Sequence, residues 1–169
     1  MRDGMLQVVA HLRGVIGELR PAGLDDLGLA LTLEGFVTRL RREAPPDGPQ
    51  IVLDLAPLPR RLPPAVEHCL FRAGQEALRN SLRHAHAQQI RVSLGVGEAT
   101  VTLGVVDDGR GFEPPARFSA LAQADHFGLV GIAERVEQAG GELVLRAQPG
   151  AGTAVTVRVP IAGEERDGA

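Results

Sequence analysis

The chain of 169 residues contains no lysine, tryptophan or tyrosine, and it has a single cysteine. All 18 basic residues are therefore arginine, so any phosphate contact must come from arginine, histidine or the backbone. We attribute this bias to GC-rich coding rather than to function. Cys69 can form no internal disulfide, and its apolar helical surroundings predict a small buried residue. This cysteine usage is compatible with a reducing cytoplasm.

The chain also lacks an excess of positive charge and a long hydrophobic run. Its formal net charge of -3 and pI near 5.9 give no electrostatic support to a nucleic-acid or membrane-surface partner. No apolar run approaches the roughly 20 residues that a spanning helix needs, and residues 1–4 do not begin a secretory signal. We expect one soluble, cytoplasmic domain with a small appendage, and an inner-membrane anchor on a longer parent protein stays open.

The first 50 residues predict two helices. An apolar stripe with alternating spacings of four and three indicates a two-helix seam that ends at Pro21, with members Met5, Val9, Leu12, Ile16 and Leu19. A second helix is expected from about residue 24 to 42, with Asp25 and Asp26 as favourable first-turn acids rather than ligands. Its predicted core residues are Leu27, Leu31, Phe36, Val37 and Leu40.

After the proline-rich break at 44–49 the period changes. A strand is predicted at 51–55, and a long helix starts at Pro63 and Pro64. The pattern then predicts a hairpin with strands at 90–96 and 101–106, a helix at 129–136, and last strands at 143–145 and 155–159. This order predicts an α/β protein, a two-layer sandwich with helices on one sheet face. It lacks the dinucleotide-binding and Walker glycine motifs.

An acidic pair and two spaced glycines follow the second strand of the hairpin, in the segment Asp107-Asp108-Gly109-Arg110-Gly111-Phe112. Such a segment in isolation is typical of a solvated turn. An ionised Asp107 at a strand end is also suited to accept a hydrogen bond from the amino group of adenine. Gly109 and Gly111 would let the backbone pass close to the base.

Two further motifs flank this segment. Glu76 and Asn80 lie one helical turn apart, so both side chains point into the same space. Gly128 and Gly131 bracket the start of a later helix, where backbone N–H groups favour phosphate. Each motif alone is common, but their order and spacing predict a nucleotide site.

These motifs resemble those of a known family. Residues 75–85 resemble the N box of histidine-kinase catalytic domains, 107–111 the G1 box, 128–131 the G2 box, and 149–153 the last glycine box. The resemblance covers about residues 50 to 160 and extends to the ATPase superfamily of gyrase, mismatch-repair proteins and heat-shock chaperones. The residue sequence of the N box, which begins Gln-Glu-Ala-Leu, and that of segment 18–29 resemble the corresponding sequences of the nitrate-sensor-like subfamily of sensor kinases. The implied architecture is a Bergerat-type fold with a mixed sheet, preceded by a helical segment.

The resemblance also implies roles for the residues of the N box. The side-chain oxygen of Asn80 would ligate Mg²⁺, which shares its ligands with the ATP phosphates. In hydrolytic members of the superfamily the residue at the position of Glu76 acts as the base, whereas in a kinase Glu76 would be a polarising group rather than the base. Arg83 and His84 occupy phosphate- and nucleotide-contacting positions, with a solvated helix face as the alternative. Arg83 would offset charge on the transferring phosphoryl group.

The other boxes are assigned in the same way. Asp107, rather than Asp108, would bind adenine, and Gly128, Leu129 and Gly131 would approach phosphate at a helix start. Residues 113–127 would form the ATP lid. Thr153 either contacts phosphate or merely begins a strand.

By this resemblance residues 1–22 are the end of a dimerisation hairpin, 23–49 a first helix and linker, 50–162 the ATP-binding catalytic domain, and 163–169 a flexible tail. The implied reaction transfers the γ-phosphoryl group of Mg-ATP to a histidine on a dimerisation domain, which we expect this chain to lack. The implied partners are that domain of the same kinase, which is a homodimer at full length, and a response regulator. One alternative is an anti-sigma-factor serine kinase, which would not need the seam at 5–19. Another is a non-catalytic ATP-binding module.

Overall fold

The computed structural model describes residues 23–114 and 127–161, and these contain one mixed five-stranded sheet in the order β1-β2-β3-β5-β4. The only parallel pair in this part of the chain joins β1 to β2, and the other three pairs are antiparallel. The strands are β1 (Gln50–Leu55), β2 (Gln89–Val96), β3 (Thr100–Asp107), β4 (Glu142–Ala147) and β5 (Thr153–Pro160). The predicted strands and the predicted hairpin are confirmed.

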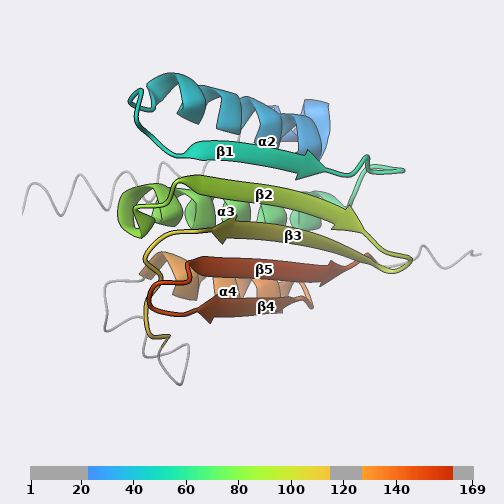
Figure 1. The fold of residues 1–169 in the computed structure, drawn as a ribbon. Helices are drawn as coiled ribbons and strands as arrows, with labels where there is room; N and C mark the ends of the chain where they lie inside the picture. Colours follow the sequence, from blue (N-terminus) through green and yellow to red (C-terminus); the bar gives the residue numbers. More distant parts are fainter. Residues whose placement is uncertain (1–22, 115–126, 162–169) are drawn as a thin grey trace, which may run out of the picture.

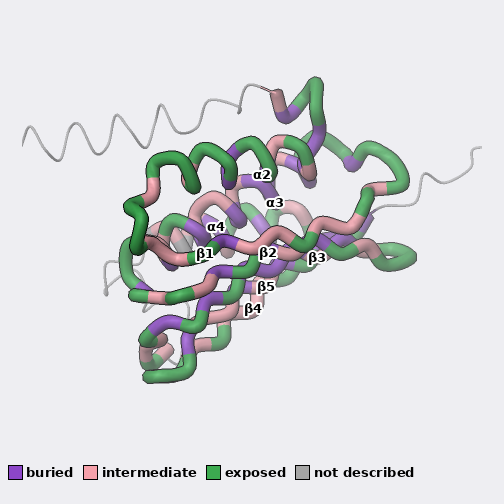
Figure 2. Tube along the Cα trace, turned by 45° about the horizontal axis from the view of Figure 1, so that its top comes forward, coloured by how far each residue is buried: buried purple, intermediate pink, exposed green. Residues whose placement is uncertain are grey.

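Three helices cover one face of this sheet, as Figures 1 and 2 show. They are α2 (Leu24–Glu43), α3 (Pro64–Asn80) and α4 (Phe127–Gln138). A π-helical turn, η1 (Ser81–Ala85), continues α3 without a break. The predicted two-layer α/β sandwich is therefore confirmed, and so is the helix start at Pro63 and Pro64.

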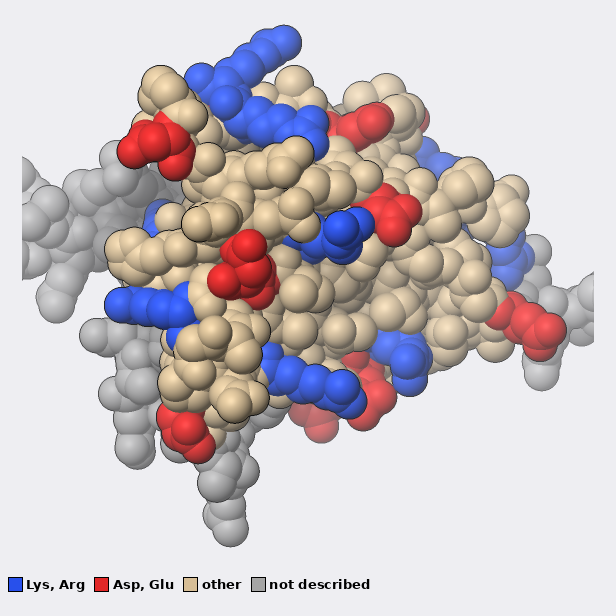
Figure 3. Space-filling model, viewed as in Figure 1, with Lys and Arg blue, Asp and Glu red and all other residues tan. Residues whose placement is uncertain are grey.

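The core lies between the sheet and the helices. Alternate residues of β2 point into it, so that Ile90, Val92 and Leu94 are buried while Arg91 is exposed on the open face. At the centre of α3, a Cβ added to Gly74 would lie 3.1 Å from Leu103 of β3 and 3.4 Å from Leu33 of α2. The glycine therefore lets α3 pack closely between the sheet and α2. Arginine and acidic side chains are interspersed across the open face (Figure 3).

The predicted core face of α2 was wrong at its first two positions. Leu27 and Leu31 are 58% and 55% exposed, whereas Leu29 and Leu33 are buried. The reason is Gly28, whose φ of 81° interrupts the helix and shifts the phase of the apolar stripe. The remaining predictions fit this phase, because Phe36 and Val37 are buried and Leu40 packs against the core.

An ion pair between the half-exposed Arg61 and the buried Glu67 ties the start of α3 to α2. The carboxylate of Glu67, 1% exposed, accepts hydrogen bonds from Arg61 Nε at 3.0 Å and Nη2 at 2.7 Å. Nη2 of Arg61 also donates to the carbonyl of Leu24 at 2.8 Å. Hydrogen bonding to Glu67, together with the negative charge of that carboxylate, raises the pKa of Arg61 above its ordinary value. The pair thus joins three segments of the chain.

Cys69 is buried in α3 as predicted, and burial raises the pKa of its thiol. None of the helices within the described ranges is both long enough and apolar enough to cross a membrane. The predicted seam at 5–19, most of the predicted lid at 113–127 and the tail at 163–169 lie outside the described residues.

Candidate functional site

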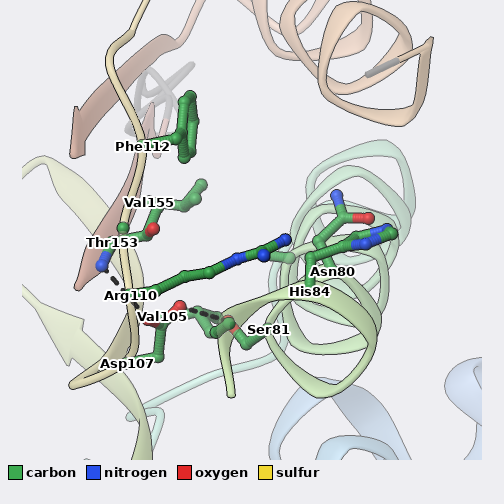
Figure 4. Close-up of a pocket in the computed structure, with 12 residues that line it drawn as sticks. Asn80, Ser81, His84, Val105, Asp107, Arg110, Phe112, Thr153 and Val155 are labelled. Carbon is green, nitrogen blue, oxygen red and sulfur yellow. Dashed lines mark hydrogen bonds between the residues drawn. The ribbon is translucent and has the colours of Figure 1, made fainter. Parts of the chain in front are cut away.

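A cavity of about 360 Å³ opens where α3 and η1 meet the ends of β3 and β5 (Figure 4). Apolar side chains supply much of its wall, namely those of Ala77, Ala85, Val105, Phe112 and Val155. The polar side chains come from Asn80, Ser81, His84, Asp107, Arg110 and Thr153. An apolar cleft with a few convergent polar groups is typical of a small-molecule site.

Asp107 is the buried acid of this cavity, and only 4% of it is exposed. Its Oδ2 accepts a hydrogen bond from the hydroxyl of Ser81 at 2.7 Å. Its Oδ1 accepts from the backbone N–H groups of Gly109 at 3.1 Å and Thr153 at 3.2 Å. A carboxylate offers about four acceptor positions, so these three neutral donors fix its orientation and leave one position. Thr153 therefore both begins β5 and helps to hold Asp107.

The glycine loop after Asp107 is held between two other segments. A Cβ at Gly109 would overlap the carbonyl of Ala85, and one at Gly111, whose φ is 57°, would overlap carbonyls of the β4–β5 turn. Between the two glycines, Arg110 donates its N–H to Ala85 at 2.7 Å and accepts from Gly150 at 2.6 Å. The backbone is thus closely packed here, and only glycine fits at both positions.

Asp108 has a different task from its neighbour. Its Oδ1 accepts hydrogen bonds from the backbone N–H groups of Gln88 at 2.8 Å and Gln89 at 2.9 Å. It holds the start of β2 and does not line the cavity. The two adjacent aspartates therefore separate into one that faces the cavity and one that braces the sheet.

Two of the predicted N-box residues, Asn80 and His84, lie together on the helical wall of the cavity (Figure 4). Glu76, one turn earlier, is half-buried and does not line the cavity. Its carboxylate instead lies against the first turn of α4, where a Cβ at Gly128 would overlap it. The carboxylate of Glu76 thus occupies the space that a side chain at residue 128 would take.

The other predicted residues of α4 are less constrained. A Cβ at Gly131 would meet no atom within 4 Å among the described residues, so packing does not require glycine there. Leu129 belongs to the first turns of α4, and its side chain lies outside what the structure describes.

Arg83 does not join Asn80 and His84 in the cavity. It lines a separate hollow with residues of α2, among them Phe36 and Glu43. The π-helical winding of η1 accounts for this, because its i to i+5 hydrogen bonding turns the chain less per residue than an α-helix does. The third residue after Asn80 is therefore carried away from the cavity, and the fourth returns to it.

The sequence reasoning missed three polar or aromatic residues of the cavity: Ser81, Arg110 and Phe112. Ser81 directly follows Asn80, and a hydroxyl at that position of the N box was the available signal. Arg110 is the one residue with a side chain between Gly109 and Gly111, so a loop that places its glycines against neighbouring backbone must project this side chain outward.

The described residues contain no cluster of three or more His, Cys, Asp or Glu that could hold a metal ion by itself. Asn80 provides an amide oxygen, which is a ligand type that Mg²⁺ accepts. Since Mg²⁺ usually keeps several waters and shares substrate phosphates, one such ligand is compatible with a metal that arrives with a nucleotide.

Comparison with known proteins finds a matching family model and relatives that are histidine kinases. Residues 65–163 match the family model described as histidine kinase-, DNA gyrase B-, and HSP90-like ATPase. Signal transduction histidine-protein kinase/phosphatase DegS of Brevibacillus brevis is 35% identical over 98% of this chain and 41% of its own length. Sensor histidine kinase LiaS of Bacillus subtilis is 33% identical over 92% of this chain and 41% of its own length. The chain thus spans less than half the length of these relatives.

Solved structures show the same fold. The histidine kinase domain of the Erythrobacter litoralis EL346 blue-light activated kinase has a TM-score of 0.70 at 17% identity, over 94% of this chain and 83% of that one. Full-length ShkA, solved in complex with AMPPNP, has a TM-score of 0.62 at 22% identity, over 77% of this chain and 30% of that one.

Proposed function

Because the chain belongs to the histidine kinase-, DNA gyrase B-, and HSP90-like ATPase family, we propose that it binds Mg-ATP in the cavity beside Asp107. We further propose that it transfers the γ-phosphoryl group to a histidine on a dimerisation domain, as the catalytic part of a two-component sensor kinase. In that role its partners are the dimerisation domain of the same homodimeric kinase and a downstream response regulator. The sensor-kinase names of its relatives support this proposal.

The observation that carries the proposal is the state of Asp107. Its carboxylate is buried at the floor of a largely apolar cavity and is held by three neutral donors. Since no cation among the described residues pairs with it, the carboxylate can accept a hydrogen bond from the exocyclic amino group of adenine at its remaining position. Val105, Val155 and Phe112 give the planar base an apolar surface to pack against.

The phosphates are proposed to lie toward Asn80, with Mg²⁺ held by the Asn80 amide oxygen, the phosphates and water. The bound ion would supply charge neutralisation on the transferring group. Glu76 lies one turn away against the start of α4, a position suited to orienting that turn and the glycines that follow it. Most of the catalysis then comes from positioning and electrostatics rather than from covalent protein chemistry.

The nucleotide site is tested by calorimetric titration of the full chain with ATP, with and without Mg²⁺. We expect saturable binding that Asp107→Asn abolishes while the circular dichroism spectrum is kept. Asp108→Asn is the matched control, because that side chain braces β2 outside the cavity. Absence of ATP binding in the folded wild-type chain, or equal affinity in Asp107→Asn, would overturn the proposed site.

Phosphoryl transfer needs a separate assay. The chain is incubated with γ-labelled ATP, alone and with a purified dimerisation domain that carries the acceptor histidine. We expect acid-labile label on the added domain and none on the chain alone. Acid-stable label on a serine would instead support an anti-sigma-type kinase, and ATP binding without any transfer would indicate a non-catalytic module.

A further inference from the structure

Arg110 is the side chain that the glycine loop presents to the cavity. Two backbone hydrogen bonds fix its main chain. The N–H of Arg110 donates to the carbonyl of Ala85, and the carbonyl of Arg110 accepts from the N–H of Gly150. Its neighbours Gly109 and Gly111 are pressed against other backbone segments, where no side chain fits. The loop therefore aims a single side chain, and Figure 4 shows it reaching across the cavity toward Asn80 and His84.

Among the described residues, no group pairs with the charge of this side chain. Asp107, the one carboxylate among the described residues that line the cavity, takes its hydrogen bonds from neutral donors. Within residues 23–114 and 127–161, the guanidinium of Arg110 makes no hydrogen bond or ion pair. Arg110 is also the only arginine among the described residues of that lining, and the chain has no lysine. A permanent cation thus reaches across a largely apolar cavity, and no described residue pairs with it.

Arg83, the other arginine considered for phosphate binding, does not line this cavity. Arg83 occupies the phosphate-contacting position in the family resemblance, yet it lines the hollow beside α2. The guanidinium that approaches Asn80 belongs to the glycine loop. Building on the proposed ATP site, we propose that Arg110 is the phosphate-binding cation of this chain and pairs with the β- and γ-phosphates of the nucleotide. A guanidinium fork matches phosphate oxygens with two parallel hydrogen bonds.

This role makes the contribution of Arg110 depend on the phosphates and not on the base. The full chain is titrated with ATP by calorimetry and with adenosine by NMR, for wild type, Arg110→Gln and Arg110→Lys. Charged hydrogen bonds of this kind predict that Arg110→Gln weakens ATP binding by about tenfold to a hundredfold. Adenosine affinity stays unchanged, and Arg110→Lys recovers part of the loss because it keeps the charge without the fork.

A second readout separates charge from shape. Salt screens the pairing of Arg110 with phosphate, so ATP affinity of the wild type falls more steeply with ionic strength than that of Arg110→Gln. Arg91→Gln is the matched control, because Arg91 is exposed on β2 and lies outside the cavity lining. It leaves both ATP affinity and its salt dependence unchanged.

The outcomes distinguish the two proposals. If wild type binds neither ATP nor adenosine, the nucleotide site itself is wrong, and the role of Arg110 falls with it. If wild type binds ATP and Arg110→Gln binds it equally well, the ATP site stands and the role of Arg110 is overturned. Equal loss of ATP and adenosine in Arg110→Gln also overturns it, since that result indicates a change in cavity shape.

Discussion

A buried carboxylate lies at each end of α3, one on the helix itself and one on β3, and the two are held in opposite ways. Glu67 in the first turn, 1% exposed, is paired with the guanidinium of Arg61. Asp107, 4% exposed, faces the other end of the helix and is held by the hydroxyl of Ser81 and two backbone N–H groups. Burial is nearly equal, so the nature of the donors distinguishes the two sites.

This difference in donors gives the two carboxylates different tasks, because one contributes to the stability of the fold and the other can bind a ligand. A buried acid that is paired with a cation has its charge neutralised locally, and its loss or that of its partner leaves an uncompensated charge in the core. An acid that is oriented by neutral donors keeps its charge and an acceptor position for a ligand. The Glu67 end therefore holds the fold together, and the Asp107 end is available for binding.

The largest expected effect is the loss of thermal stability in Arg61→Met, which leaves the Glu67 carboxylate buried without its cation. ATP affinity, measured by calorimetry, should not change. The double variant Arg61→Met, Glu67→Met serves as control, because two apolar side chains remove the stranded charge and restore most of the melting temperature. A parallel loss of ATP affinity in Arg61→Met would show that the two ends are not separate.

Next comes Gly28→Ala, which belongs to the same end because Arg61 Nε lies 3.3 Å from the added Cβ. At a φ of 81° and a ψ of 176°, a region that essentially only glycine occupies, an alanine is expected to cost about 1–3 kcal/mol of unfolding free energy, measured by urea denaturation. Gly35→Ala in the same helix is the matched control. Its Cβ meets no atom within 4 Å, and it should stabilise by about 0.5–1 kcal/mol.

A smaller effect is expected at the binding end. Ser81→Ala removes one of the three donors to Asp107, so the carboxylate is less firmly oriented. We expect ATP to bind about tenfold more weakly, which corresponds to about 1.4 kcal/mol, with little change in melting temperature. Ser93→Ala on β2 is the control, since Ser93 lies outside the cavity lining. Unchanged affinity in Ser81→Ala would mean that the backbone donors suffice.

The smallest effect concerns Cys69, which lies in α3 near the Glu67 end. Burial raises its pKa, so the folded thiol stays protonated at a pH where the unfolded thiol ionises. The stability that this group contributes is present below the ordinary thiol pKa and declines as pH rises through it. Iodoacetamide should therefore alkylate native Cys69 slowly at pH 8. Arg61→Met should accelerate the reaction and Asp107→Asn should not, as followed by mass spectrometry.

Local patterns predicted much of the fold. The prolines at 63 and 64, the alternation along β2 and the apolar spacing of α3 each correspond to an observed element. The phase of α2 was missed because a helical stripe assumes constant winding, and Gly28 breaks it. A positive φ in the middle of a helical pattern is set by tertiary contacts, here with Arg61, and composition does not reveal it.

The motifs predicted part of the site. Asn80, His84 and Asp107 were assigned to one nucleotide site and all three line one cavity, although their roles remain predictions. The one-turn spacing of Glu76 and Asn80 did not bring Glu76 into that cavity, because its carboxylate lies against α4. Two of the three donors to Asp107 come from residues 26 and 46 positions away, so no local pattern indicates them. Arg83 and Arg110 differ through the winding of η1 and the packing of two glycines, and both are properties of the folded chain.

The π-helical turn makes chain length, rather than residue type, the determinant of which arginine meets the cavity. Such a turn holds one more residue than the α-helix that it interrupts. Deletion of Ala85, the last residue of the turn, would allow ordinary α-helical winding and would rotate the position of Arg83 back toward Asn80. The same deletion would remove the carbonyl that accepts the backbone N–H of Arg110, so the loss of a single codon would affect both the helical and the loop arginine.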